Sequence, residues 1–512
     1  MAVFINFWKN RVRSGFFLRR VASKLMGEIG FTGFAVAFVH FDSRSILTMT
    51  WLGIPSAHRT ILNTILIVLA MAVFGGKCTG QIANTFYKSF SLNNSGNFSQ
   101  STPNSLHDVL LTSTNNGLGL IGENVFMRSV VVQNGGHYAI SNMSSNSSRA
   151  ITLGNVTPFN NLHTGGLNDV IALSGNSSLS IIGANTVGGG PLSAALGSHG
   201  NFLVQAGSTL SISSVISGVN LGFNKTGAGL MTLSGSNTYS GATNINGGTL
   251  AITNNLALGS LGTIGFGGGT LRYSGANVDL SNRFSVDSNQ HISIDTNGHD
   301  ITFASNLISV GGSLAKSGAG KLVLSGTNTY SGTTTINSGV LIVNGTQTGG
   351  EYFINSSGTL AGNGIIKATV HVGVGGALAS GDGLGTLEIG GNLSFVSGST
   401  LAVEINSSTL QSDLTRVAGS LALNNAALQL TDFANVLIPL GTEVTIATFN
   451  SINGEFQGLG EGARFFNGQN EWKISYGIVS AGKITLTAVP EPTSLLFVCS
   501  ALCLSSTRRQ RR

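Results

Sequence analysis

The chain of 512 residues is poor in charge and rich in glycine, since only 9% of its residues are charged and 72 are glycine. Ordinary domains carry about 25% charged residues, and this scarcity excludes a helical bundle or a coiled coil as the main architecture. The 7 prolines and the lack of an every-third-residue glycine period exclude collagen, and the 41% of hydrophobic residues exclude a disordered polar chain.

The net charge of +6 is distributed unevenly along the chain. Residues 1–88 carry +8 and residues 490–512 carry +3, whereas residues 89–489 carry −5. The mildly acidic middle argues against nucleic acid as a partner. The three cysteines, Cys78, Cys499 and Cys503, also lie near the ends, which excludes a disulfide scaffold or a thiolate metal site in the body.

Residues 1–83 are expected to form an N-terminal extension and a signal peptide. The apolar stretch 61–74 follows Arg59, is shorter than a membrane-spanning helix and has the length of a signal-peptide core. Small residues before position 81 predict cleavage after Gly80 and export through the secretion translocon. Because this stretch lies far from Met1, one alternative is a start at Met49, and another is a basic amphipathic anchor around residues 7–25.

The body contains an internal repeat, with copies at residues 225–252 and 316–343 that are identical at 17 of 28 positions. Each copy alternates apolar and polar residues over short runs, which predicts half-buried strands, with Gly, Ser and Asn at the corners between them. The repeat signature consists of Gly227, Gly229, Leu233, Gly235, Asn237, Tyr239, Gly241, Gly318, Gly320, Leu324, Gly326, Asn328, Tyr330 and Gly332.

A strand–corner unit of this size buries its apolar face only by stacking on a neighbour. The predicted fold is therefore all-β, a right-handed parallel β-helix with short helical targeting segments at both ends; the alternative is an antiparallel sandwich array. The β-helix is expected over residues 84–357, and a C-terminal β-helical region over 358–488. Asn237 and Asn328 are expected to hydrogen-bond along ladders between coils, and Tyr239 and Tyr330 to pack in ladders rather than stack on sugars.

Within the body the best cluster of catalytic residue types is Asp287, His291, Asp295, His299 and Asp300. Clustered carboxylates with a basic partner are typical of β-helical polysaccharide lyases and hydrolases. We expect instead that these are polar residues on exposed faces and corners, as are Asp382 and Glu388. The sequence therefore predicts no catalytic residues, no metal and no cofactor.

Residues 489–512 form a distinct C-terminal signal. Pro490, Glu491 and Pro492 precede a short apolar stretch, which is followed by Arg508, Arg509, Arg511 and Arg512. Arginine clusters prefer the cytoplasmic side of a membrane, so this stretch is expected to enter the inner membrane transiently. The alternative is a tail anchor that stays in place.

Both patterns resemble known bacterial elements. Residues 489–512 resemble the PEP-CTERM sorting signal of envelope proteins, which implies processing by an exosortase. The repeat resembles the autotransporter-associated β-strand repeat, which implies a secreted β-helical passenger, and residues 358–488 resemble the passenger region that accompanies such repeats. The expected function is that of an exported structural or adhesive protein of the cell surface or extracellular matrix, with extracellular polysaccharide as a candidate partner; the alternative is a carbohydrate-active β-helix enzyme.

Overall fold

A computed structural model of the chain describes residues 199–477 and 482–490, and before residue 199 it describes thirteen strands and the stretch 176–182. The chain divides into two compact units, Met1–Gly262 and Thr263–Arg512, called unit 1 and unit 2 below. The targeting helices expected at both ends, Gly80, Glu491, Pro492 and the terminal arginines lie outside the described residues.

Unit 1 consists mainly of three sheets in which each strand pairs in parallel with the strand one coil further along the chain. The first sheet contains β3 (Ala83–Thr85), β5 (Asp108–Leu111), β8 (Ser129–Val132), β11 (Asp169–Leu173), β14 (Gly200–Val204), β17 (Phe223–Thr226) and β19 (Thr243–Ile245). The second contains β4 (Phe90–Ser91), β6 (Gly117–Ile121), β9 (His137–Asn142), β12 (Ser178–Ile181), β15 (Thr209–Ile212), β18 (Leu230–Leu233) and β20 (Thr249–Ile252). The third contains β7 (Val125–Met127), β10 (Arg149–Leu153), β13 (Leu192–Leu196) and β16 (Val215–Ser217). A separate antiparallel pair is formed by β1 (Val36–Phe41) and β2 (Leu47–Leu52).

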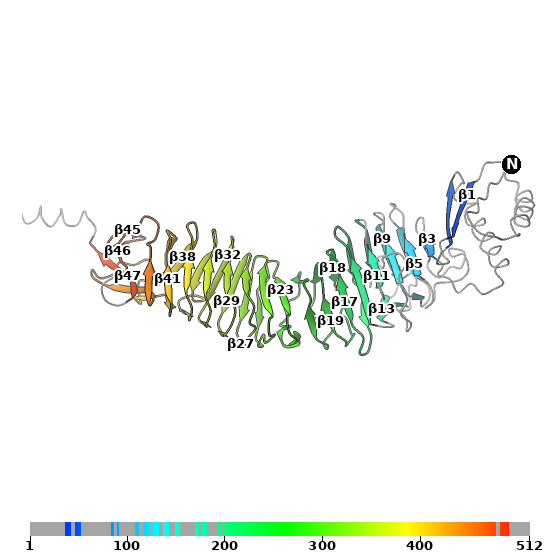
Figure 1. Cartoon of the computed structure of the whole chain (residues 1–512), viewed down its shortest axis with the longest axis horizontal. Helices are drawn as coiled ribbons and strands as arrows, with labels where there is room; N and C mark the ends of the chain where they lie inside the picture. The colour runs from blue at the N-terminus through cyan, green and yellow to red at the C-terminus, as the bar shows by residue number, and fades with distance from the viewer. Residues whose placement is uncertain are drawn as a thin grey trace, which may run out of the picture. The chain divides into compact units, whose positions relative to one another are not determined.

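Unit 2 is built in the same way, apart from a short antiparallel pairing of residues 405–406 with residues 411–412 and its C-terminal strands, and its successive strands lie side by side in Figure 1. Its first sheet contains β22 (Thr270–Tyr273), β23 (His291–Asp295), β25 (Ser313–Ser317), β28 (Thr334–Ile336), β31 (Tyr352–Ile354), β34 (Val370–Val372), β37 (Leu393–Phe395), β41 (Ser420–Ala422) and β44 (Ser451–Asn453). Its second contains β24 (Ile301–Phe303), β26 (Lys321–Leu324), β29 (Gly339–Val343), β32 (Gly358–Gly362), β35 (Ala377–Ser380), β38 (Thr400–Asn406), β39 (Gln411–Ser412) and β42 (Ala427–Asp432). Its third contains β27 (Thr327–Asn328), β30 (Thr346–Gln347), β33 (Ile365–Ile366), β36 (Thr386–Ile389), β40 (Leu414–Val417) and β43 (Glu443–Thr448). The short strand β21 (Ile264–Phe266) and a 3-10 turn at Ser281–Arg283 precede most of these coils.

Most strands place alternate residues in the core, and the register stacks like residues on like. Met231 pairs with Leu210 of the preceding coil and Leu250 of the following one, and all three are fully buried. In unit 2, Leu341 pairs with Leu322 and Leu360 in the same manner. Since each strand finds its backbone partners one coil away, the stacked strands satisfy backbone polarity and bury apolar columns together. The fold is thus the parallel β-helix that the repeat predicts.

The structure departs from the expected strand pattern in the last strand of each repeat copy. The alternation places Ala251 and Ile342 on the outward face, yet both are buried, as are the residues on either side of them. Both faces of β20 and β29 are therefore covered, and period-2 alternation describes only the other strands of the copy.

The parallel arrangement ends before the chain does. After β43, the strands β45 (Arg464–Asn467), β46 (Asn470–Ser475) and β47 (Lys483–Val489) complete the third sheet of unit 2 by antiparallel pairing. This hairpin arrangement places Trp472, which is fully buried, at the end of the coil stack. Among the described residues, helices long and apolar enough to cross a membrane are absent.

Candidate functional site

The most unusual feature of the first repeat copy is a buried lysine at its first position. Lys225 lies on β17 and alternates with the buried Phe223, so its side chain points into the coil and is fully buried. Its Nζ atom donates hydrogen bonds to the carbonyl oxygens of Thr226 at 3.0 Å, Gly227 at 2.8 Å and Gly247 at 3.0 Å. An ammonium has three donors and no acceptor, so these three carbonyl groups satisfy it completely. We call this arrangement the lysine cage.

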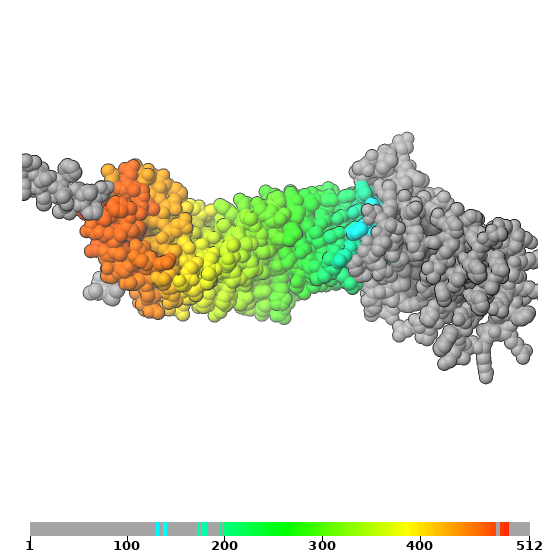
Figure 2. Space-filling model, turned by 90° about the horizontal axis from the view of Figure 1, so that it is seen from above, coloured from blue at the N-terminus to red at the C-terminus, as the bar shows by residue number. Residues whose placement is uncertain are grey.

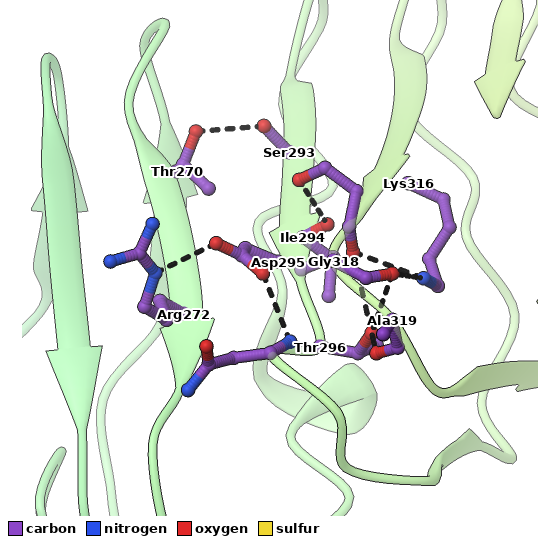
Figure 3. Close-up of polar contacts among 11 residues, drawn as sticks. Thr270, Arg272, Ser293, Ile294, Asp295, Thr296, Lys316, Gly318 and Ala319 are labelled. Atoms are coloured by element: carbon purple, nitrogen blue, oxygen red, sulfur yellow. Dashed lines mark hydrogen bonds and ion pairs between the residues drawn. The ribbon is translucent and has the colours of Figure 1, made fainter. Parts of the chain in front are cut away.

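The second copy builds the same cage around Lys316. Its Nζ atom donates to the carbonyl oxygens of Ser317 at 3.0 Å, Gly318 at 2.7 Å and Ser338 at 3.1 Å, as Figure 3 illustrates for Gly318. The side chain is again fully buried, on β25. Gly227 and Gly318 have φ angles of 73° and 75°, a conformation that L side chains rarely adopt and that directs the carbonyl groups of the turn toward the ammonium.

Burial shapes the titration of both lysines. Loss of solvent lowers the pKa of Lys225 from 10.5 to about 8. Burial also lowers the pKa of Lys316 to about 8, against the opposing pull of the Asp295 and Asp300 carboxylates, which raise it. Sequence reasoning missed both lysines because lysine is almost never fully buried. The sequence feature that could have indicated their burial is their position. In both copies the lysine follows a buried residue by two positions on an alternating strand.

The two signature asparagines connect coils through backbone groups, whereas the sequence predicts a ladder of side chains. Asn237 Oδ1 accepts a hydrogen bond from the Ile216 backbone N–H at 2.7 Å, and its Nδ2 donates to the Ala257 carbonyl at 2.5 Å. Asn328 Oδ1 accepts from the Leu307 N–H at 2.7 Å. Asn237 thereby connects the backbone of β16 with a corner of the following coil, and Asn328 binds a corner of the preceding coil. These hydrogen bonds keep the desolvation cost of the buried amides small.

The signature tyrosines lie in the core. Tyr239 and Tyr330 are buried, and their hydroxyls lie 2.7 Å and 2.6 Å from the Oγ1 atoms of Thr243 and Thr334. Burial raises the pKa of Tyr330 to about 12. Rings placed in this way pack between coils and present no face to a sugar at the surface.

The remaining signature residues occupy the core and the corners. Leu233 and Leu324 are fully buried on β18 and β26. Several corners require glycine because a Cβ atom there would meet the backbone of the preceding coil. These positions are Gly229, Gly235, Gly241, Gly320 and Gly332. A Cβ atom at Gly326 would meet the side-chain amide of Asn306.

The candidate catalytic cluster is distributed over separate structural contacts. Asp295 forms an ion pair at 2.7 Å with Arg272 of the neighbouring strand, as Figure 3 shows. It also accepts the Asn297 N–H. Asp300 accepts the Lys321 N–H at 2.8 Å, and Asp287 accepts the Ser285 hydroxyl at 2.8 Å.

The histidines and the outlying acids of the cluster have partners of their own. His291 Nδ1 lies 3.1 Å from Ser313 Oγ, and the His299 backbone N–H donates to the Thr296 carbonyl at 2.8 Å. Asp382 pairs with Lys321, and Glu388 pairs with Arg416 on the next coil. In the part of the chain that the structure describes, histidines, cysteines and carboxylates do not gather in groups of three or more suited to a metal ion.

Of the C-terminal sorting motif, the described residues include only Pro490. Its carbonyl oxygen accepts a hydrogen bond from the Arg464 guanidinium at 3.4 Å, so the described chain ends beside β45. The sorting motif itself stays a prediction from the sequence, and its other residues, Glu491, Pro492, Arg508, Arg509, Arg511 and Arg512, lie outside the described residues.

Comparison with known proteins finds relatives of the repeat. The model of the passenger-associated-transport repeat matches residues 223–252 and 314–343, which contain both lysine cages. The Adhesin BmaC autotransporter of Brucella suis biovar 1 (strain 1330) is 32% identical over 234 residues, covering 40% of this chain and 7% of that protein. An Extracellular serine protease of Serratia marcescens is 43% identical over 101 residues, covering 20% of this chain and 10% of that protein.

Among solved structures, the Haemophilus influenzae Hap adhesin matches with a TM-score of 0.20 and 10% identity, over 77% of this chain and 66% of that one. The chain spans a tenth or less of the length of the two curated relatives that it matches.

Proposed function

We propose that this chain is an exported, non-enzymatic β-helical protein that acts as a structural or adhesive element. The observation that carries the proposal is the set of stacked parallel coils that contains two copies of a passenger-associated-transport repeat. In both copies the caged lysine and the signature asparagine turn inward to hold coils together, which leaves the outward faces of the strands other than β20 and β29 for contacts with other molecules.

The chain is an exported protein of the cell surface or the extracellular space, since its repeats match a passenger-associated model and a curated relative is an autotransporter adhesin. The adhesive role of the protein is our proposal. The match to the Serratia marcescens protease covers a tenth of that protein, and the carboxylates and histidines of the candidate cluster are held in separate contacts. We therefore favour the adhesive role over an enzymatic one.

Export through the secretion translocon, processing by an exosortase-type enzyme and contact with extracellular polysaccharide are further parts of the proposal. Their support is the order of segments in the sequence, with an apolar core at 61–74, a Pro-Glu-Pro motif and a terminal arginine cluster. Mass spectrometry of the termini of the native protein tests export and processing. We expect a mature form that begins after Gly80 and lacks Arg508–Arg512; an intact C-terminus on the surface form would contradict processing.

Adhesion is tested in the native host by comparing a deletion strain with two other strains. One produces the wild-type chain, and the other produces a control variant whose fold is unchanged. We expect attachment to surfaces and matrix to fall in the deletion strain and to return with the wild-type chain. A purified protein that degrades acidic or neutral polysaccharides, with activity lost in the Asp295→Asn and Asp300→Asn variants, would replace this proposal with the enzymatic one.

A further inference from the structure

An unusual set of apolar side chains is exposed where the described chain ends. The loop between β42 and β43 exposes 56% of Phe433, 71% of Leu437 and 66% of Leu440, and β45 exposes 59% of Phe466. We call these four residues the exit patch. They lie at the C-terminal end of unit 2, which Figure 2 shows in orange. Exposed apolar side chains that gather in one region mark interaction surfaces.

Hydrogen bonds hold the exit patch around Pro490, where the described part of unit 2 ends. On one side, the Gly441 N–H donates to the Ala488 carbonyl at 2.8 Å and the Ala488 N–H donates to the Thr442 carbonyl at 2.9 Å, which fixes the end of the patch loop to β47. On the other side, Arg464, which shares the exposed face of β45 with Phe466, donates to the Pro490 carbonyl. The patch therefore flanks the exit of the chain.

The middle of the patch loop is equally well fixed. Asn470 accepts the Ile438 N–H at 2.9 Å through Oδ1 and donates to the Val436 carbonyl at 2.8 Å through Nδ2. The loop is therefore held against the β45–β46 turn while Leu437, between these two anchored positions, points its side chain into solvent. An exposed leucine on a fixed loop costs solvation free energy that a partner surface would recover.

The sequence beyond Pro490 indicates what that partner is. Leu495 begins an apolar run and is five residues from Pro490, so an extended chain separates them by at most about 18 Å. The arginine cluster 508–512 follows the run and favours the cytoplasmic side of a bilayer. When the run enters a membrane, the exit of unit 2 is held close to the headgroups.

Charges around the exit are compatible with a lipid surface. Lys483 pairs with Glu443 at 2.6 Å, and Arg464 lies 3.5 Å from the nearly buried Glu471 carboxylate. Because these charges are compensated within the chain, the apolar side chains dominate the properties of this end, and a highly charged macromolecule would find little complementary charge here.

We propose that the exit patch docks on the lipid bilayer while the C-terminal segment is inserted, so that Phe433, Leu437, Leu440 and Phe466 enter the interface between headgroups and acyl chains. The proposal rests on the exosortase processing that is part of the proposed function, for which the C-terminal segment would enter the membrane as the sequence predicts. Apolar side chains of interfacial segments enter roughly 5–10 Å into this boundary. The patch thereby sets which end of the coil stack faces the membrane before processing.

The test uses the full chain with single tryptophan substitutions, Leu437→Trp and Phe466→Trp, mixed with vesicles of phosphatidylethanolamine and phosphatidylglycerol that carry brominated acyl chains. Val310→Trp is the matched control, because Val310 is 69% exposed in the same unit but lies on a corner of the coil stack. The native tryptophans are present in every variant, and the wild-type signal is subtracted. We expect bromine to remove about half of the added fluorescence at positions 437 and 466 and to leave position 310 unchanged.

The outcomes separate this inference from the proposed function. Chains that float with the vesicles but show equal fluorescence at positions 437, 466 and 310 overturn patch docking and leave anchoring intact. Chains that fail to float overturn both. A blue shift at positions 437 and 466 without lipid, together with a dimer in sedimentation, assigns the patch to a second copy of the chain and also overturns the proposal.

Discussion

The two repeat copies form the same internal contacts, but the residues around them differ. Both cage a lysine with three carbonyl groups and pair a buried tyrosine with a threonine four residues later. Around Lys316, however, Asp295 and Asp300 act on the ammonium, whereas burial alone shifts the pKa of Lys225. The contacts common to both copies are those made largely within the repeat, which shows what the repeat signature specifies.

The asparagines illustrate the part that the neighbouring coil decides. Asn237 Nδ2 reaches forward to the Ala257 carbonyl, but Asn328 Nδ2 turns back to the Gly326 carbonyl at 3.3 Å. The register places Gln347 on the coil after Asn328, and within the described residues the buried Gln347 amide has no hydrogen-bond partner. One signature residue therefore forms two inter-coil bonds in the first copy and one in the second.

The largest effect is expected at the glycine that faces the cage from the next coil. Gly248 and Gly339 have φ angles of 60° and 69°, and a Cβ atom at either would meet the carbonyl oxygens of two glycines one coil below. Strain and overlap predict that Gly248→Ala and Gly339→Ala each lower the free energy of unfolding by about 3 kcal/mol, measured by denaturant titration followed by circular dichroism.

The adjacent position provides the control for this prediction. Gly247 aligns with Ser338 of the second copy, so Gly247→Ser should change stability by less than about 0.5 kcal/mol. Equal destabilisation by Gly247→Ser and Gly248→Ala would show that the backbone conformation at Gly248 is not the cause.

A smaller effect should distinguish the two asparagines. Asn237→Ala leaves the Ile216 N–H and the Ala257 carbonyl without their partner, whereas Asn328→Ala deprives only Leu307 of an inter-coil bond. At about 1 kcal/mol for each unsatisfied buried group, we expect losses of about 2 and about 1 kcal/mol, respectively. Denaturant midpoints of the two variants measure the difference, with Asn244→Ala as a control of similar chemistry at a partly exposed site. Equal losses would contradict the two-to-one count of bonds.

Beyond these substitutions, the stability of the chain should depend on pH. The unfolded lysines have a pKa near 10.5 and the folded ones near 8, so between these values the unfolded chain binds more protons and stability rises with pH. Below about pH 8 both states are charged and the lysines contribute no slope. We expect the urea midpoint of the wild type to rise between pH 8 and 10 relative to the Lys225→Met/Lys316→Met variant. A wild-type midpoint that falls relative to this variant would mean that the carbonyl cage outweighs desolvation.

Sequence reasoning found the strands and the core because their signal is periodic. The apolar positions of the repeat, such as Leu233 and Leu324, are buried as the alternation predicts. No periodic signal in the sequence predicts the change to antiparallel pairing after β43. The direction of a strand depends on the point at which the chain turns back into the sheet. The lysine cage was not predicted from the sequence because lysine side chains are almost always exposed. Only the equivalent position of Lys225 and Lys316 in the two copies indicates that they are buried. The partners of Asn237 lie 20 and 21 residues away and depend on the coil length.

The lysine cage also bears on survival outside the cell. Trypsin-like proteases cut after lysine or arginine only when the side chain enters their specificity pocket, which requires an exposed, locally extended chain. Lys225 and Lys316 keep their ammonium groups inside the coil, bound to the backbone that a protease would have to pull away. A tryptic digest of the intact chain should therefore spare the bonds after both residues until the coils open, which makes the corresponding peptides a direct reporter of unfolding.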